Sequence, residues 1–538
     1  MSFAIVCSDL SFAWADGTVV LDGLDAAFGT GRTGLIGVNG SGKSTLLKII
    51  AGELRPASGT VSVDGEIGHL PQNLVLAGAP TVADLLGIGE TRAALHAIER
   101  GEATEENFTA VGDGWDVEER ARAELDRLGL GHLDLDRTVP TLSGGEAVMV
   151  GLAAQFLARP GVLLLDEPTN NLDLDARRRL YDAVASWTGV LVVVSHDREL
   201  LDRVDEIADL RDGAIRTFGG NLSAYEDLLA VEREAAERAV RVAETDLRRQ
   251  KRELEEAHVK LARRKRYGDK MFENKREPKI IMQERKRQAQ VAAGKHRLMH
   301  EERLADARGR LTEAEEAVRE DTAIRIKLPA TRVPAGRTVV TVTGLTAPEP
   351  ETGTLTELIV RGPERLALVG PNGSGKTTFL RMLTGERVPE GTEVTMGVDA
   401  VRYLPQRLDV LDEDASVLDN VRAQAPTTPV NDIRAGLARF LFRGARAGQR
   451  AGTLSGGERF RAVLASLLLA EPAPKLLLLD EPTNNLDMAG AAQLAQALAA
   501  YEGALIVVSH DPPFLRTLGI TRWLRMDRAS GLSETEPM

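Results

Sequence analysis

Two glycine-rich segments, each ending in lysine and a hydroxyl residue, have the residue types of a nucleotide-binding loop. The lysines, Lys43 and Lys376, lie 333 residues apart (376 − 43). In such a loop, backbone N–H groups wrap the β- and γ-phosphates, the lysine neutralises their charge, and the hydroxyl can bind Mg²⁺. The sequence therefore predicts two sites for ATP with Mg²⁺. The predicted ATP-binding residues are Gly37, Asn39, Gly40, Ser41, Gly42, Lys43, Ser44 and Thr45 in one copy, and Gly370, Asn372, Gly373, Ser374, Gly375, Lys376, Thr377 and Thr378 in the other. The predicted metal ligands among them are Ser44 and Thr377.

An acidic pair and a histidine follow each loop at matched spacings. The aspartate of each pair ends an apolar run, where it can hold the magnesium shell, and the adjacent glutamate can polarise the attacking water. The histidine comes 30 residues after the aspartate in both copies (196 − 166 and 510 − 480) and is expected to contact the γ-phosphate. A lone histidine is more often structural, but two at matching positions favour a catalytic role. The predicted metal ligands here are Asp166 and Asp480, and the predicted catalytic residues are Glu167, Glu481, His196 and His510.

The elements that must position these residues are predicted to be alternating strands and helices. Each glycine loop lies between a strand-like run and a helical run, which is the context that a phosphate-binding loop needs. Further apolar runs are typical of buried parallel strands. They are Val162–Leu165, Leu191–Val194, Leu476–Leu479 and Leu505–Val508. The repeated order predicts an α/β fold unit present twice.

The same spacing predicts three domains. We expect one α/β domain at 1–221, a connector at 222–324 and a second α/β domain at 325–538. The offset between the copies falls from 333 at the glycine loops to 312 at the later Ser-Gly-Gly segments (455 − 143). The first copy therefore has 21 extra residues (333 − 312), around 91–124.

The connector has the pattern of two long antiparallel helices. Leucine and valine recur every seven residues in each half, with alanine between them, and the remaining residues are mostly charged. Such narrow apolar stripes are buried only if the helices fold back on each other, and glycine and proline place the turn at 267–278.

Positive charge is concentrated at the predicted turn. Residues 260–297 contain 14 Lys and Arg against 4 Asp and Glu, a balance of +10 in a chain whose net charge is −13. Clustered basic residues bind the phosphates of nucleic acid, and a helix pair serving only as a spacer would not need them. The predicted RNA-binding residues are Arg263, Arg264, Lys265, Arg266, Lys270, Lys275, Arg276 and Lys279.

Composition restricts the remaining possibilities. A single cysteine, Cys7, excludes an intramolecular disulfide and the cysteine clusters that hold zinc or iron–sulfur centres. No apolar run approaches the roughly 20 residues needed to cross a bilayer, and the N-terminus lacks the pattern of a signal peptide. We therefore expect a cytoplasmic protein without a membrane span.

Over nearly the whole chain, these motifs resemble the ATP-binding cassette superfamily. The Leu-Ser-Gly-Gly-Glu segments resemble its signature motif, which caps the γ-phosphate of ATP held by the opposite cassette. The resemblance implies an intramolecular pair of cassettes with two composite sites, in which Lys43 faces Ser455 and Lys376 faces Ser143. The implied ATP-binding signature residues are Ser143, Gly144, Gly145, Ser455, Gly456 and Gly457. Gln72 and Gln406 match the glutamine loops that sense magnesium, and Asp173 and Asp487 match the D-loops.

Within that superfamily the chain is most similar to the ABC-F class of ribosome-binding ATPases. The similarity rests on glutamate after both Ser-Gly-Gly motifs, on Glu-Pro-Thr-Asn in both copies and on the helical connector. It implies a monomer that binds the ribosome at the tRNA exit site. It also implies that the connector reaches toward the peptidyl-transferase centre, contacting ribosomal RNA and P-site tRNA. Protection from antibiotics that bind there is favoured over a general translation factor.

Departures from the family pattern predict unequal sites. Trp14 lies 23 residues before the first glycine loop (37 − 14), where it can stack on adenine, whereas the second copy has Ala347 there. The first signature continues with Ala147, where the second has Arg459. Two other classes remain as alternatives. A transporter ATPase subunit gives the basic connector no role, and a DNA-repair or chromosome ATPase would need zinc cysteines or a much longer coiled coil.

Overall fold

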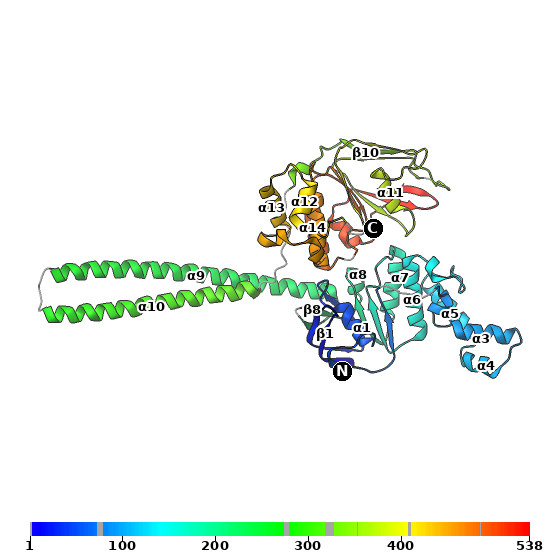
Figure 1. Cartoon of the computed structure of the whole chain (residues 1–538), viewed down its shortest axis with the longest axis horizontal. Helices are drawn as coiled ribbons and strands as arrows, with labels where there is room; N and C mark the ends of the chain where they lie inside the picture. Colours follow the sequence, from blue (N-terminus) through cyan, green and yellow to red (C-terminus); the bar gives the residue numbers. More distant parts are fainter. Residues whose placement is uncertain are drawn as a thin grey trace. The chain divides into compact units, whose positions relative to one another are not determined.

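The computed structural model describes residues 3–72, 79–211, 213–273, 279–317, 328–351, 353–406, 410–484 and 486–537. The chain forms two compact units. One unit contains both α/β copies, Met1–Leu222 and Thr322–Met538, and the other is the connector, Ser223–Asp321 (Figure 1).

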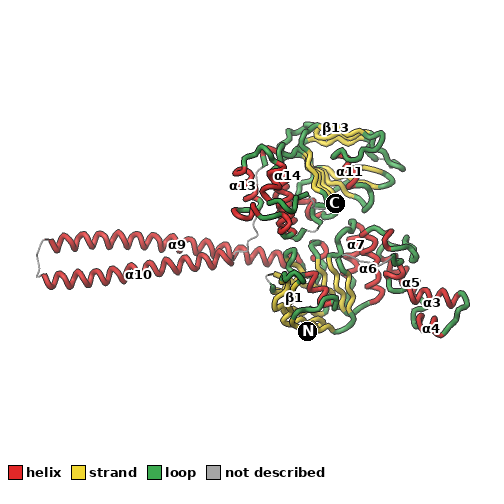
Figure 2. Tube along the Cα trace, viewed as in Figure 1, coloured by secondary structure: helices red, strands yellow, loops and turns green. Residues whose placement is uncertain are grey.

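Each copy contains a six-stranded sheet and a separate three-stranded antiparallel sheet (Figure 2). In the first copy the large sheet has the order β5-β6-β7-β3-β8-β9, parallel except for β9. The small sheet has the order β2-β1-β4. The strands are β1 (Phe3–Ala13), β2 (Val19–Gly29), β3 (Gly31–Gly37), β4 (Ser58–Val63), β5 (Ile67–Leu70), β6 (Val162–Asp166), β7 (Val190–Val194), β8 (Glu206–Arg211) and β9 (Ala214–Gly219). The helices are α1 (Lys43–Ile50), α2 (Val82–Leu85), α3 (Gly89–Glu99), α4 (Glu105–Val111), α5 (Val117–Arg127), α6 (Gly144–Ala158), α7 (Leu174–Ala185) and α8 (Arg198–Leu201).

The second copy repeats this topology. Its large sheet has the order β14-β15-β16-β12-β17-β18 and its small sheet β11-β10-β13. The strands are β10 (Thr338–Thr343), β11 (Glu357–Arg361), β12 (Arg365–Val369), β13 (Glu393–Met396), β14 (Val401–Leu404), β15 (Leu476–Asp480), β16 (Ala504–Val508), β17 (Arg522–Asp527) and β18 (Gly531–Glu534). The helices are α11 (Lys376–Leu383), α12 (Val417–Gln424), α13 (Val430–Arg439), α14 (Gly456–Leu468), α15 (Met488–Ala499) and α16 (Pro512–Thr517). The predicted α/β duplication is confirmed.

Burial explains why the central strands are continuous apolar runs. All residues of β6, β7, β15 and β16 are buried, because a parallel sheet is covered on both faces. Helix α1 packs its apolar residues, such as Leu46 and Leu47, into a core shared by the large and small sheets. Helix α11 does the same in the second copy through Phe379 and Leu380. These contacts fix each glycine loop at the end of a central strand. Cys7, on β1, is buried in the first of these cores.

The extra residues of the first copy form additional helices that project away from the large sheet, beyond α6 (Figure 1). The region 91–124 contains most of α3, all of α4 and most of α5. A tilted aromatic pair, Phe108 and Trp115, has ring centroids 6.0 Å apart, and both side chains are about half exposed.

The connector consists of two long helices, α9 (Leu222–Glu273) and α10 (Lys279–Ala317). Their shared side buries Ala257 and Ala307, and Arg310 donates to Asp246 across the pair at 2.8 Å. At 1.5 Å per residue, α9 is about 78 Å long. The prediction that the first helix ends before Tyr267 is wrong, since α9 continues through Gly268. A single glycine costs a helix only about 1 kcal/mol, which the surrounding helix-forming residues offset.

Candidate functional site

Both glycine loops end in a helix that begins without a side-chain cap. The residue before α1 is Gly42 (φ +99°) and the one before α11 is Gly375 (φ +102°), in the left-handed region that glycine adopts at low cost. Because no side chain caps these ends, the first backbone N–H groups remain available to a phosphate.

Each loop lysine donates hydrogen bonds to backbone carbonyl oxygens of its own glycine loop. Lys43 Nζ donates to the carbonyl oxygens of Gly37 (2.8 Å) and Val38 (3.1 Å). Lys376 Nζ makes the matching bonds to Gly370 (2.7 Å) and Pro371 (2.9 Å). Both ammonium groups are buried, which lowers their pKa values. A buried cation bonded to neutral carbonyls is suited to receive an anion, so this geometry fits a phosphate ligand.

The predicted magnesium ligands present oxygen atoms at the ends of β6 and β15. Ser44 Oγ donates to Asp166 Oδ1 at 3.0 Å, which places a hydroxyl and a carboxylate side by side. In the second copy, Asp480 Oδ2 accepts from the Tyr403 hydroxyl at 3.0 Å, while its buried Oδ1 has no partner among the described residues. Hard oxygen donors of this kind are what Mg²⁺ prefers, so both sites fit the ion.

The two glutamates predicted to be catalytic have strained backbones. Glu167 (φ +48°) and Glu481 (φ +47°) both adopt the left-handed conformation that non-glycine residues rarely take. Such strain gathers at functional sites, where it fixes the direction of a side chain. His196 Nε2 lies 3.2 Å from Glu167 Oε1, and His510 Nε2 lies 3.3 Å from Glu481 Oε1.

Burial disfavours the charged form of both residues in each pair. It raises the pKa of Glu167 to about 8 and that of Glu481 to about 7. It lowers the pKa of His196 to about 4 and that of His510 to about 3. Burial disfavours the charged form of either group, so each imidazole is neutral at physiological pH. A neutral imidazole can donate one hydrogen bond and accept another.

Contacts between the two copies bring part of each to the other's glycine loop. Asn372 Nδ2 donates to the Asn171 carbonyl at 2.6 Å, and its backbone N–H donates to Asp173 Oδ2 at 3.4 Å. The reciprocal contact runs from the Asn39 N–H to Asp487 Oδ2 at 3.2 Å. The aspartates that match D-loops therefore contact the opposite phosphate loop.

The second nucleotide site is a composite cavity of about 510 Å³. Its lining contains the signature residues of the first copy, Ser143, Gly144 and Gly145. From the second copy it contains Gly373, Gly375, Lys376, Thr377, Thr378, Gln406, Asp480, Glu481 and His510. The structure thus brings together most of the residues predicted for this site.

The first site is a larger cavity of about 810 Å³. Its lining contains Trp14, Asn39, Gly40, Gly42, Lys43, Ser44, Thr45, Gln72, Glu167 and His196. Asp487 of the second copy lines it, but the signature residues Ser455, Gly456 and Gly457 do not. The described structure therefore assembles the two sites unequally.

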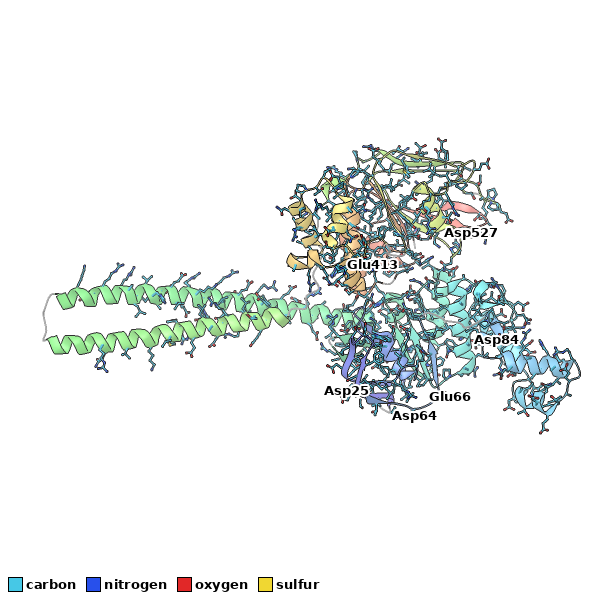
Figure 3. All side chains as sticks on the ribbon, viewed as in Figure 1. Asp25, Asp64, Glu66, Asp84, Glu413 and Asp527 are labelled. Atoms are coloured by element: carbon cyan, nitrogen blue, oxygen red, sulfur yellow. The ribbon has the colours of Figure 1, made fainter. Side chains whose placement is uncertain are left out.

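The signature serines begin helices in the same way. Ser143 caps α6 and Ser455 caps α14, each in a reciprocal capping box with the glutamate three residues later. The residue after the second of these glutamates, Arg459, donates to Glu413 at 2.8 Å (Glu413 is labelled in Figure 3). The first copy has Ala147 at the position of Arg459, so this hydrogen bond is specific to the second signature.

The predicted RNA-binding residues lie near the far ends of the connector helices. Arg263, Arg266 and Lys270 are exposed on α9, and Tyr267 beside them is 69% exposed. Arg264 and Lys265 also belong to α9, and Lys279 begins α10. Lys275 and Arg276 lie outside the described residues.

Sequence reasoning missed two partly buried residues at the sites, Arg177 and Tyr403. Arg177 lines both cavities, and Tyr403 donates to Asp480. Each of the two residues could have been found by comparing the copies, because the residue type differs between them at that position. The second copy has Ala491 at the position of Arg177, and the first has His69 at the position of Tyr403.

Trp14 offers a test of unequal adenine binding. Its indole is 44% exposed at the first cavity and packs edge-on against Phe12, with ring centroids 5.0 Å apart. In a full-length chain whose second site is disabled by Lys376→Ala, Trp14→Ala should weaken ATP binding by about 1–3 kcal/mol, the range for stacking of a base on an aromatic side chain. Calorimetric titration measures the change. Trp115→Ala, which removes an exposed tryptophan elsewhere, is the control, and equal affinities in all three proteins would refute the stacking role.

Comparison with known proteins agrees with this site. Residues 22–170 and 356–484 match the ABC transporter family, and each segment contains one glycine loop and one acidic pair. The fold and site thus define a protein with two ATP-binding cassettes. The tylosin resistance ATP-binding protein TlrC of Streptomyces fradiae is 34% identical over 530 residues, covering 92% of each chain. The probable ATP-binding protein YheS of Escherichia coli K12 is 32% identical over 532 residues, covering 95% of this chain and 77% of the relative. The chain belongs to the ABC-F class of ATP-binding cassette proteins and is an ATP-hydrolysing enzyme.

Solved structures show the same tandem fold. The structure titled RNase-L Inhibitor aligns with a TM-score of 0.57 at 20% identity, covering 99% of this chain and 90% of the other. Archaeal ribosome recycling factor aABCE1, solved with a ribosomal stalk protein, aligns with a TM-score of 0.56 at 20% identity, covering 98% and 90%. Among the described helices, none is both long and apolar enough to cross a membrane.

Proposed function

We propose that this protein is an ATP-switched ribosome factor that protects translation from antibiotics acting near the peptidyl-transferase centre. Two bound ATP molecules close the cassettes, the closed form binds at the tRNA exit site, and hydrolysis releases it. The observation that carries this proposal is the connector. Exposed basic residues lie near the C-terminal end of α9, a helix about 78 Å long, and basic residues clustered in this way bind the phosphates of RNA.

ATP with Mg²⁺ would bind at both composite sites. The loop lysines and the free N–H groups of α1 and α11 would hold the phosphates, and Ser44, Asp166, Thr377, Asp480, Gln72 and Gln406 would complete the magnesium shells. Glu167 and Glu481 would polarise the attacking water, and His196 and His510 would contact the γ-phosphate. Two observations support this assignment: Asp480 Oδ1 has no hydrogen-bond partner among the described residues, and Ser44 donates to Asp166.

Resistance is favoured over a general role in translation by one relative. TlrC, a tylosin resistance protein by name, matches this chain over 92% of both lengths, so the similarity extends over both cassettes and the connector. A transporter subunit would leave the basic connector without a role. We therefore propose that ribosomal RNA and P-site tRNA are the partners of the basic residues between positions 263 and 279, which form the connector tip.

Two experiments on the full-length protein test this function. The Glu167→Gln, Glu481→Gln double variant should pellet with ribosomes in ATP and not in ADP, because only ATP closes the cassettes and the variant cannot leave the closed state. Expression of the unaltered protein in a sensitive host should raise the minimal inhibitory concentration of tylosin, the drug that the relative's name suggests. Ribosome binding without resistance would favour a general translation factor, and no ribosome binding would refute the proposal.

A further inference from the structure

Arg177 makes contacts that join the two nucleotide sites. It lies in the first turns of α7, with a side chain only 12% exposed. Its Nη1 donates to Asp197 Oδ2 at 3.1 Å in its own cassette and to the His510 carbonyl at 3.0 Å in the other. Its Nε donates to the Leu172 carbonyl at 3.3 Å. One guanidinium therefore contacts three segments, and its planar fork holds them in a fixed relation.

At the first site, Arg177 is tied to the residue that follows the catalytic histidine. Asp197 directly follows His196, and its carboxylate is 7% exposed. Oδ1 caps α8 by accepting from the Leu200 N–H at 3.0 Å, and Oδ2 accepts from the Tyr181 hydroxyl at 2.8 Å as well as from Arg177. With these partners, the carboxylate cannot move without disturbing the loop that carries His196.

At the second site, Arg177 acts on the backbone of the histidine itself. The His510 carbonyl accepts from Arg177, and the His510 N–H donates to Glu481 Oε2 at 3.3 Å. The Leu172 carbonyl belongs to the segment whose neighbours, Asn171 and Asp173, contact the second phosphate loop. Arg177 therefore touches the surroundings of both catalytic glutamates.

The second cassette lacks this link. The copies align at an offset of 314 through this segment (487 − 173 and 510 − 196), which pairs Arg177 with Ala491 and Tyr181 with Ala495. Both alanines line the first cavity, and neither side chain has a polar atom to reach across to the opposite cassette. The link from one site to the other is thus built once, from the first cassette.

We propose that Arg177 is a positioning residue that couples ATP hydrolysis at the two sites. Its hydrogen bond to Asp197 ties it to the loop that carries His196. Its hydrogen bond to the His510 carbonyl influences the placement of Glu481, which accepts from the His510 N–H. A change at one site therefore alters the geometry of the other. This inference rests on the proposed catalytic roles of Glu167 and Glu481, which the double Gln variant tests separately.

Additivity of ATPase rates measures the coupling. In the full-length protein, Glu167→Gln leaves only the second site active and Glu481→Gln only the first. Independent sites would give two single-site rates that add up to the rate of the parent. With Arg177 present, we expect the parent rate to exceed that sum by about fivefold or more, the lower end of usual allosteric couplings. In the Arg177→Gln background the ratio should fall to about one.

The neighbouring Arg178 provides the matched control. Its side chain is 70% exposed and ion-paired to Asp175 on the same helix, so Arg178→Gln should keep the ratio of the parent. If Arg177→Gln does not fold, Tyr181→Phe removes one hydroxyl that holds Asp197, and it should lower the ratio while leaving the ring in place. A ratio near one in the parent, or an unchanged ratio in a folded Arg177→Gln or Tyr181→Phe protein, overturns the coupling. A double Gln variant that still hydrolyses ATP overturns the catalytic assignment instead.

Discussion

The Glu167→Gln, Glu481→Gln double variant is expected to lose ATP turnover, with kcat lower by a factor of about 10²–10⁴. The amide keeps the shape of each side chain but cannot accept a proton from the attacking water. The loop lysines and the helix ends of α1 and α11 are untouched, so ATP should still bind. Phosphate release measures turnover, and equilibrium dialysis with labelled ATP measures binding.

A glutamate at the edge of the same cavity controls for loss of charge. Glu199 lines the first cavity, yet its side chain is half exposed and paired with Arg203. Glu199→Gln should hydrolyse ATP at a rate close to that of the unaltered protein. Turnover by the double variant at more than about a tenth of the parent rate would show that other residues activate the water.

The second large effect is expected at the connector tip. Replacing Arg263, Arg264, Lys265 and Arg266 by Ala should weaken ribosome binding and reduce its dependence on salt. Each basic residue that contacts a phosphate releases a counterion, so loss of four contacts should flatten the log–log salt slope by about three to four units. Ribosome pelleting over a range of potassium concentrations measures the slope, and ATPase activity without ribosomes should stay unchanged.

A second cluster of basic residues on α9 serves as a control, because it tests whether the effect on ribosome binding depends on where the charge is removed. Arg248, Arg249, Lys251 and Arg252 also lie on α9, where Arg248 and Arg249 pair with acidic side chains of that helix. Their replacement by Ala removes the same formal charge farther from the C-terminal end of α9. A salt slope that falls equally in both variants would contradict a specific RNA contact at the tip and favour the view of the connector as a charged spacer.

The glycine loops, the acidic pairs and the buried strands could be predicted because each depends on local sequence. A phosphate loop needs glycine at Gly42 and Gly375, where φ is positive, and a central parallel strand needs a continuous apolar run. The seven-residue stripe predicted two paired helices for the same reason. Each of these patterns depends on the immediate surroundings of the residues that form it, so it can be read without knowing which distant segments come together.

The remaining features depend on contacts between distant segments. Arg177 and the His510 carbonyl are 333 residues apart in sequence, and an arginine on a helix surface has no local signal of such a bond. The unequal assembly of the two cavities depends equally on how the cassettes meet. The sequence predicts the end of α9 too early, because an isolated glycine is only a weak signal for the end of a helix and the surrounding helix-forming residues offset its cost.

The only thiol of the chain, Cys7, lies inside the core between β1 and α1. Burial raises the pKa of this thiol to about 11, so the reactive thiolate is scarce at neutral pH and reagents reach it poorly. The natural protein therefore behaves toward maleimides almost as a cysteine-free scaffold. A single cysteine placed at an exposed position such as Lys270 would carry a fluorophore or a photo-crosslinker at one known place, and the surroundings of the tip could be mapped without first redesigning the protein.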